Sequence, residues 1–327
     1  MKEKSPHFDG KDALRVPQRL KHRLVFQPKA SRLKFFAFLY LYCQAGVTQA
    51  NLILTMFQSV IKRKAFLLFI GLIWSLITYS QDKDLQKSRI AILEEGLLLY
   101  KLEKASWHGT DILVHDNSAL INQIAGYLSY VESDTTKTIF WNKTDQIILT
   151  VSFDSIPNEK SGIANTQVRI PTTKETDLIA LRNAAFEKLS KNEDKFFTFY
   201  ERTNPNLIPL ITPKERIVFI LTGSTEKQLC IGNDYKLWFN DKNKVTKKAQ
   251  LHKSLIPIGA EDNSVGTYHS HILADQPFMT STDICTFLLY KDILHMSKHT
   301  VVSDKYTSIF DTDRLTFIII PRDNKQH

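Results

Sequence analysis

The sequence predicts a protein of the α+β class, in which strands gather in groups and helices stand between the groups. Three stretches place apolar residues at helical spacing. Short runs rich in β-branched and aromatic residues, bounded by turn residues, predict the strands. Because these elements do not alternate as regular strand–helix–strand units, a mainly parallel sheet is not expected.

The first expected domain covers residues 82–205. A helix is predicted from Asp84 to about Ser106, where Ile90, Leu93, Leu97 and Leu102 share one face. The segment Ser106–Asp111, with Gly109, is expected to form the helix end and a turn. Strands are expected at Gly126–Val131, Lys137–Trp141 and Gln146–Phe153, and a second helix at about Glu175–Ser190. No constellation of catalytic residues stands out in this domain, so its role stays open.

The second expected domain covers residues 206–327 and begins after a predicted linker or long turn, Thr203–Asn206. One helix, from Thr282 to about Met296, separates the strands of this domain into two groups. The expected strands are Arg216–Leu221, Gln228–Ile231, Lys236–Phe239, Gly266–His269, Thr300–Ser303, Thr307–Phe310 and Leu315–Ile320.

The charge distribution argues against nucleic-acid binding. The chain of 327 residues has a formal net charge of +9. Residues 1–81 hold 13 of the 43 basic and 3 of the 34 acidic residues, which leaves 30 basic and 31 acidic residues in the rest. Nucleic-acid binding needs a basic surface that neutralises phosphates. Since the basic excess lies in the leader, no nucleic-acid partner is expected.

The leader predicts export. Lys62, Arg63 and Lys64 precede an apolar run of 13 residues, Ala65–Ile77, which ends in a short polar segment. This is the layout of a secretory signal peptide, and the run is shorter than the ~20 residues of a spanning helix. Residues 56–81 are therefore interpreted as a signal peptide that meets the membrane only during export. Residues 1–55 are interpreted as an over-extended gene start, and the mature protein as periplasmic or secreted.

The motif that predicts chemistry lies in the second domain. His269 and His271 are separated by one residue, so on a strand both imidazoles point to the same face. Asp283 follows at the start of the predicted helix, in Thr-Ser-Thr-Asp. Two histidines and one carboxylate are a ligand set for Zn²⁺ that leaves a fourth position open, as in catalytic zinc sites. Taken singly, an H-x-H pair is common, and Asp283 is an ordinary first-turn acid.

The order of these residues resembles the JAMM motif of MPN-type metalloproteases, which reads H-x-H-P, a short loop, and S-x-x-D. The resemblance covers about residues 212–327 and implies an MPN-like mixed sheet with flanking helices. It also implies zinc held by His269, His271 and Asp283, a metal-activated water, and Thr280 in place of the active-site serine. The family's general base is a glutamate on an early strand, for which Glu226 is the best placed candidate. Ile272 stands at the position of the motif's proline.

Together these features predict an exported zinc-dependent peptidase or isopeptidase acting on a peptide or protein substrate. Two alternatives stay open: a non-catalytic envelope or surface protein that keeps an MPN-like fold, with or without metal, and a binding module in which the histidine pair is incidental.

Among other candidate residues, Asp234 and Glu261 rank below Glu226 as the base, and His252 is expected to be partly exposed. His299 is expected near the helix end, and the sequence leaves substrate and oligomeric state undetermined.

Overall fold

A computed structural model describes residues 83–322 of the protein, except residues 155, 159, 226–228 and 259–265. The described residues belong to one compact unit, which begins at Leu76. The interpreted gene start and signal peptide therefore lie outside the described residues, as does Glu226. Within the described part, no helix combines the length and the apolar character that crossing a membrane requires.

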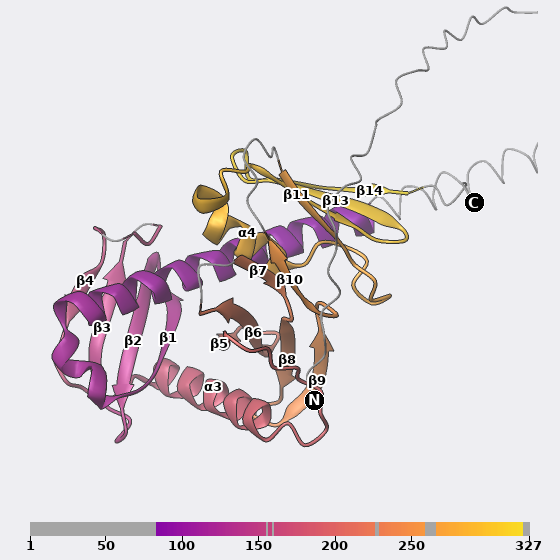
Figure 1. Cartoon of the computed structure of the whole chain (residues 1–327). Helices are drawn as coiled ribbons and strands as arrows, with labels where there is room; N and C mark the ends of the chain where they lie inside the picture. Colours follow the sequence, from indigo (N-terminus) through magenta and orange to yellow (C-terminus); the bar gives the residue numbers. More distant parts are fainter. Residues whose placement is uncertain (1–82, 155, 159, 226–228, 259–265, 323–327) are drawn as a thin grey trace, which may run out of the picture. The chain divides into compact units, whose positions relative to one another are not determined.

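The first described element is a single long helix over residues 83–116 (Figure 1). The prediction that a helix begins near Asp84 is confirmed, but the predicted end and turn at Ser106–Asp111 is wrong, because these residues stay helical. Gly109 allows close packing here: an ideal Cβ on it would lie 3.0 Å from the Cβ of Thr138. Gly96 likewise allows close packing against the C-terminal part, because an ideal Cβ on Gly96 would lie 2.8 Å from the Cβ of Ile284. The helix thus contacts elements on both sides of the predicted domain boundary.

The first sheet has the order β1-β2-β3-β4, and all of its pairs are antiparallel. Its strands are β1 (Ile124–Glu132), β2 (Thr135–Asn142), β3 (Ile147–Phe153) and β4 (Ile163–Asn165), preceded by the 3-10 helix η1 (Ser118–Gln123). The three predicted strands of this region are confirmed. Ala105 and Ile112 of the long helix pack against Phe140 and Leu149 of the sheet.

Helix α3 (Thr173–Lys191) follows the first sheet and confirms the second predicted helix. It begins with a capping box, in which the hydroxyl of Thr172 accepts a hydrogen bond from the backbone N–H of Glu175 while the Glu175 carboxylate accepts one from the N–H of Thr172. Leu178 packs on the first sheet, whereas Leu181 packs against the second sheet. The helix therefore joins the two halves of the fold.

The second sheet has the order β5-β6-β8-β9 and is antiparallel throughout. Its strands are β5 (Thr203–Ile211), β6 (Arg216–Ser224), β8 (Tyr235–Phe239) and β9 (Val245–Gln250). The predicted linker Thr203–Asn206 is wrong, since it forms the first part of β5. β5 lies at the sheet edge, where Pro205 and Pro209 are tolerated because an edge strand leaves half of its N–H groups unpaired.

The C-terminal part contains a mixed sheet of order β11-β12-β13-β14 and a separate pair, β10-β7. The strands are β7 (Leu229–Gly232), β10 (Leu255–Ile258), β11 (Gly266–Ser270), β12 (Lys298–Val302), β13 (Tyr306–Asp311) and β14 (Thr316–Pro321). β11 and β12 are parallel and are connected by helix α4 (Ser281–Leu294), which lies beside the long helix in Figure 1. Separate groups of antiparallel strands with intervening helices place the protein in the α+β class, as predicted.

Candidate metal centre

Four buried side chains converge at the start of α4. The ligand atoms of His252, His269, His271 and Asp283 all lie within 4.8 Å of one another. None of the four residues is more than 6 % exposed. A buried group of three imidazoles and one carboxylate could hold a metal ion. The structure therefore brings the three ligands predicted from the sequence together and adds His252.

The strand β11 positions the two predicted histidines. His269 lies in β11 opposite Val301 of β12, and the N–H of His271 donates to the carbonyl of Val302 at 2.8 Å. This hydrogen bond keeps the chain extended for one residue beyond the strand. Since side chains two residues apart on an extended chain share a face, both imidazoles reach the same centre.

The capping box of α4 positions the carboxylate. Asp283 is the third residue of the helix, and its Oδ2 accepts hydrogen bonds from the N–H and the hydroxyl of Thr280, each at 2.8 Å. Oδ2 also faces Nε2 of His271 at 3.4 Å, whereas Oδ1 faces Nε2 of His252 at 2.8 Å and Nε2 of His269 at 3.4 Å. Because Thr280 gives its one O–H to Asp283, it orients this carboxylate rather than presenting a donor to a substrate.

His252 is buried, in contrast to the prediction from the sequence. It was expected to be partly exposed, but it is 3 % exposed, in the loop between β9 and β10. Its Nε2 lies 2.8 Å from Oδ1 of Asp283, and its Nδ1 lies 3.5 Å from Oδ2 of Asp234. Asp234 is buried too and accepts a hydrogen bond from the N–H of Thr222. No local pattern marks His252, because only the loop conformation carries it into the core.

Three buried nitrogens of the cluster have no hydrogen-bond partner within the described residues: Nδ1 of His252, Nε2 of His269 and Nε2 of His271. Nδ1 of His252 faces Oδ2 of Asp234 at 3.5 Å. The two Nε2 atoms each lie 3.4 Å from an oxygen of Asp283, His269 from Oδ1 and His271 from Oδ2. Unpaired buried nitrogens are costly, so their convergence on a carboxylate is the arrangement that a bound cation would satisfy.

Hydrogen bonds on the far side of the rings set the tautomers. Nδ1 of His271 lies 3.1 Å from the carbonyl oxygen of Gln276, which only accepts, so Nδ1 carries the hydrogen and Nε2 carries the lone pair. Nδ1 of His269 contacts Nε2 of His299 at 3.0 Å, and Nδ1 of His299 contacts the hydroxyl of Thr267 at 2.7 Å. Since the Thr267 hydroxyl can donate or accept, donation outward along this chain leaves a lone pair on Nε2 of His269, and donation inward leaves a hydrogen there. Outer partners of this kind are usual around metal-binding histidines.

His299 was expected near the helix end, but it lies within β12 and is 1 % exposed. The alternation of the strand, in which His299 and the buried Val301 share a face, is the signal that could have predicted its burial.

The charge states of the cluster differ from one ring to the next. Burial lowers the pKa of His269 to about 3 and that of His299 to about 4, so both rings are neutral at physiological pH. Burial also lowers the pKa of His252, but the carboxylates of Asp283 and Asp234 outweigh it and raise that pKa to about 10. Although burial disfavours the Asp283 carboxylate, the nearby imidazoles hold its pKa well below the ordinary value. In the metal-free protein His252 is thus a cation paired with Asp283.

A small cavity of about 50 Å³ borders the cluster. Its lining includes His252, His271, Ser270 and Ile272, and its volume is sufficient for a water molecule. The predicted general base, Glu226, and the lower-ranked Glu261 lie outside the described residues. The third candidate, Asp234, contacts His252 and does not touch the other three residues of the cluster through any described ion pair.

Comparisons with protein-family models, with curated proteins and with solved structures found no match for this chain. The geometry of the cluster is therefore the basis for assigning a function.

Proposed function

We propose that this protein is an exported zinc-dependent hydrolase that cuts peptide or isopeptide bonds. The observation that carries the proposal is the convergence of the unpartnered Nε2 atoms of His269 and His271 on the buried carboxylate of Asp283. The leader pattern of residues 56–81 supports export. The resemblance of the His-Ser-His and Thr-Ser-Thr-Asp segments to the JAMM motif supports the reaction class.

The donor set supports zinc in particular. Neutral imidazole nitrogens and one carboxylate oxygen are common ligands of Zn²⁺. In a tetrahedral site with bonds of ~2.0–2.1 Å, neighbouring ligand atoms are ~3.3 Å apart. The separation of 3.4 Å between Nε2 of His269 and Oδ1 of Asp283 agrees with that value. Bound zinc would polarise the scissile carbonyl and lower the pKa of water to ~7.

The residues around the ion would then have separate roles. His269, His271 and Asp283 hold the ion, and Thr280 keeps the carboxylate oriented through its two hydrogen bonds. His252 lies beside Asp283, with its Nδ1 3.5 Å from Asp234, so it is placed to pass a proton to the leaving amine, while Asp234 would stabilise the imidazolium. Glu226 stays the predicted base from the family resemblance.

A second function is favoured by one specific observation. His252 lies as close to Asp283 as the other two histidines do, so it can serve as a fourth ligand once its proton is displaced. Four protein ligands make a closed, structural zinc site. The protein would then be a non-catalytic envelope protein stabilised by metal.

The metal content of the purified chain tests the shared premise of both functions. We expect about one zinc ion per chain by elemental analysis, because the cluster forms a single centre. The double variant His269→Ala/His271→Ala should lose the ion, since it removes the two unpartnered Nε2 atoms that converge on Asp283. His115→Ala is the matched control, because His115 is exposed on the long helix. Equal zinc in the double variant and the wild type would refute the site.

Replacement of His252 by glutamine separates the two functions. In the hydrolase, His252→Gln should keep its zinc and lose about 10²–10⁴-fold in the hydrolysis of a pool of quenched peptides and lysine-linked isopeptides, as for removal of an acid–base group. In the closed structural site the same variant should lose zinc affinity, and the wild type should cut none of the probes. Retention of both zinc and full hydrolysis would show that His252 has neither role.

A further inference from the structure

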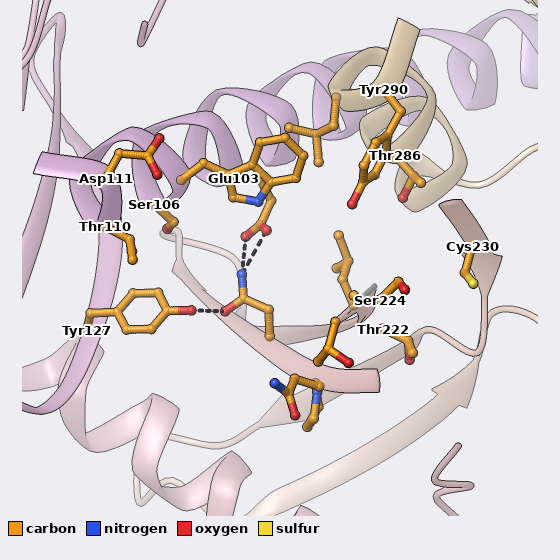
Figure 2. Close-up of a pocket in the computed structure, with 18 residues that line it drawn as sticks. Glu103, Ser106, Thr110, Asp111, Tyr127, Thr222, Ser224, Cys230, Thr286 and Tyr290 are labelled. Carbon is orange, nitrogen blue, oxygen red and sulfur yellow. Dashed lines mark hydrogen bonds between the residues drawn. The ribbon is translucent and has the colours of Figure 1, made fainter. Parts of the chain in front are cut away.

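A second site is suggested by a cavity that none of the four metal-cluster residues lines. The cavity has a volume of about 430 Å³ and lies where the long helix, β1, β5, β6, β7 and α4 meet (Figure 2). This volume is within the range of small-molecule sites, ~300–1,000 Å³. What the cavity can bind follows from the charge and shape of its wall.

A buried carboxylate lies in this wall. Glu103 is 5 % exposed, and its two carboxylate oxygens accept hydrogen bonds of 2.6 and 2.7 Å from the side-chain amide of Asn206. The hydroxyl of Tyr127 donates to the amide oxygen of Asn206 at 3.2 Å and so fixes the orientation of the amide. In Figure 2, dashed lines mark these hydrogen bonds, which run from Glu103 and from Tyr127 to the amide between them.

The carboxylate has no compensating positive charge among the described residues that line the cavity. That lining contains no lysine, arginine or histidine, and it contains a second acid, Asp111. A neutral amide satisfies only part of the hydrogen-bonding capacity of a carboxylate, which has about four acceptor sites. A buried charge without a counter-ion is unfavourable, so a cationic ligand would be stabilised here.

The rest of the wall is suited to an organic cation. Trp107 and Tyr290 meet edge to face, with ring centroids 5.3 Å apart, and both line the cavity together with Leu289. Aromatic faces attract cations, and they also bury the hydrocarbon part of a ligand. Ser106 and Thr222 also line the cavity, and their hydroxyls are hydrogen-bonded to the hydroxyl of Ser129 and to the carbonyl of Asn233, each at 2.7 Å. An inorganic cation would make no use of the aromatic side of this wall.

We propose that the cavity binds a primary alkylammonium group, with the ammonium on Glu103 and the alkyl chain against Trp107 and Tyr290. An ammonium brings three N–H donors, which suit the free acceptor sites of the carboxylate. The group occurs both in free amines and in lysine side chains, so the two sources need separate probes. This site does not depend on the proposed hydrolase function.

The protonation of Glu103 adds a test that needs no variant. Burial raises the pKa of Glu103 to about 7, the hydrogen bonds from Asn206 oppose this shift, and the charge of Asp234 adds to it. The other titratable groups facing it are Asp111 on its own helix, Tyr127 on β1, Cys230 on β7, and Tyr290 and Cys285 on α4. An ammonium ion, charged throughout pH 6–8, should therefore bind more tightly as the pH rises through this range.

The experiment is a titration of the full-length protein with n-butylammonium, followed by calorimetry or by NMR, with n-butanol as the uncharged match. We expect Glu103→Gln to lower the affinity for n-butylammonium by about tenfold or more, equivalent to ~1.4 kcal/mol, without changing that for n-butanol. Asp111→Asn is the matched control for loss of one charge at the exposed rim and should have a smaller effect.

A second arm uses N-acetyl-lysine methylamide, and tighter binding of one probe identifies a peptide lysine or a free amine as the source. The double variant His269→Ala/His271→Ala should bind the preferred probe as the wild type does, which separates this site from the metal centre. The proposal is overturned if neither probe binds, if n-butanol binds as tightly as n-butylammonium, or if the wild-type affinity does not rise between pH 6 and pH 8.

Discussion

Zinc at about a thousandfold excess over its dissociation constant is expected to raise the free energy of unfolding by ~4 kcal/mol. The physical reason is that the candidate ligands come from three separate segments: the loop before β10, the strand β11 and the start of α4. The unfolded chain holds these segments apart, so the ion binds the native state preferentially. Denaturant unfolding in zinc and in a chelator, compared at the same pH, measures the difference.

Two variants make this measurement specific. In His269→Ala/His271→Ala, zinc should leave the midpoint of unfolding unchanged, whereas His115→Ala should respond as the wild type does. Equal stabilisation of the double variant would mean that zinc binds elsewhere, and it would remove the support for both proposed functions.

Substitution of Glu175 by glutamine is expected to destabilise the protein by ~3 kcal/mol, the lower end of the cost of breaking a buried ion pair. The side chain of Glu175 is fully buried, and it accepts hydrogen bonds from both terminal nitrogens of Arg169, at 2.6 and 2.7 Å. It also accepts from the hydroxyl of Tyr130 at 2.8 Å and from the N–H of Thr172 at 2.7 Å. Glutamine can accept only part of this set, and it leaves Arg169, whose side chain is 34 % exposed, without its partner.

The pH dependence identifies the charge as the cause. Burial alone raises the pKa of Glu175, but the hydrogen bonds from Arg169, Thr172 and Tyr130 outweigh it and lower the pKa to about 2. In the unfolded chain the Glu175 carboxyl has its ordinary, higher pKa. The contribution of the ion pair to the free energy of unfolding is therefore fully present above that pKa and is lost as the pH falls towards 2. The cost of Glu175→Gln should therefore shrink between about pH 5 and pH 2.

Glu187→Gln is the matched control on the same helix. Glu187 pairs with Lys191 on the exposed surface of α3, where an ion pair contributes little. Thermal unfolding of the two variants over the same pH range should separate them clearly. A cost of Glu175→Gln that stays constant down to pH 2 would contradict the electrostatic origin and leave packing or helix capping as the cause.

The strands and helices that the sequence predicted correctly are those with a strong local pattern. Short runs rich in β-branched and aromatic residues located β2 and β6, and the Thr-Ser-Thr-Asp segment located the start of α4. The errors have a common physical cause. Gly109 is locally a turn residue, yet it stays helical because the long helix needs a residue without a side chain where it meets Thr138. The prolines of β5 argue against a strand, but an edge position accommodates them.

The residues of the candidate site also fall into two groups, those that the sequence predicted and those that only the structure revealed. The sequence predicted that His269, His271 and Asp283 lie together, because strand alternation puts both imidazoles on one face and the order and spacing of the three residues resemble the JAMM motif. Only the tertiary structure decided that His252, Asp234 and His299 join them, and that Glu103 lies buried beside Asn206. These contacts bring together residues far apart in the chain, and their burial depends on how separate elements pack rather than on any pattern within one segment.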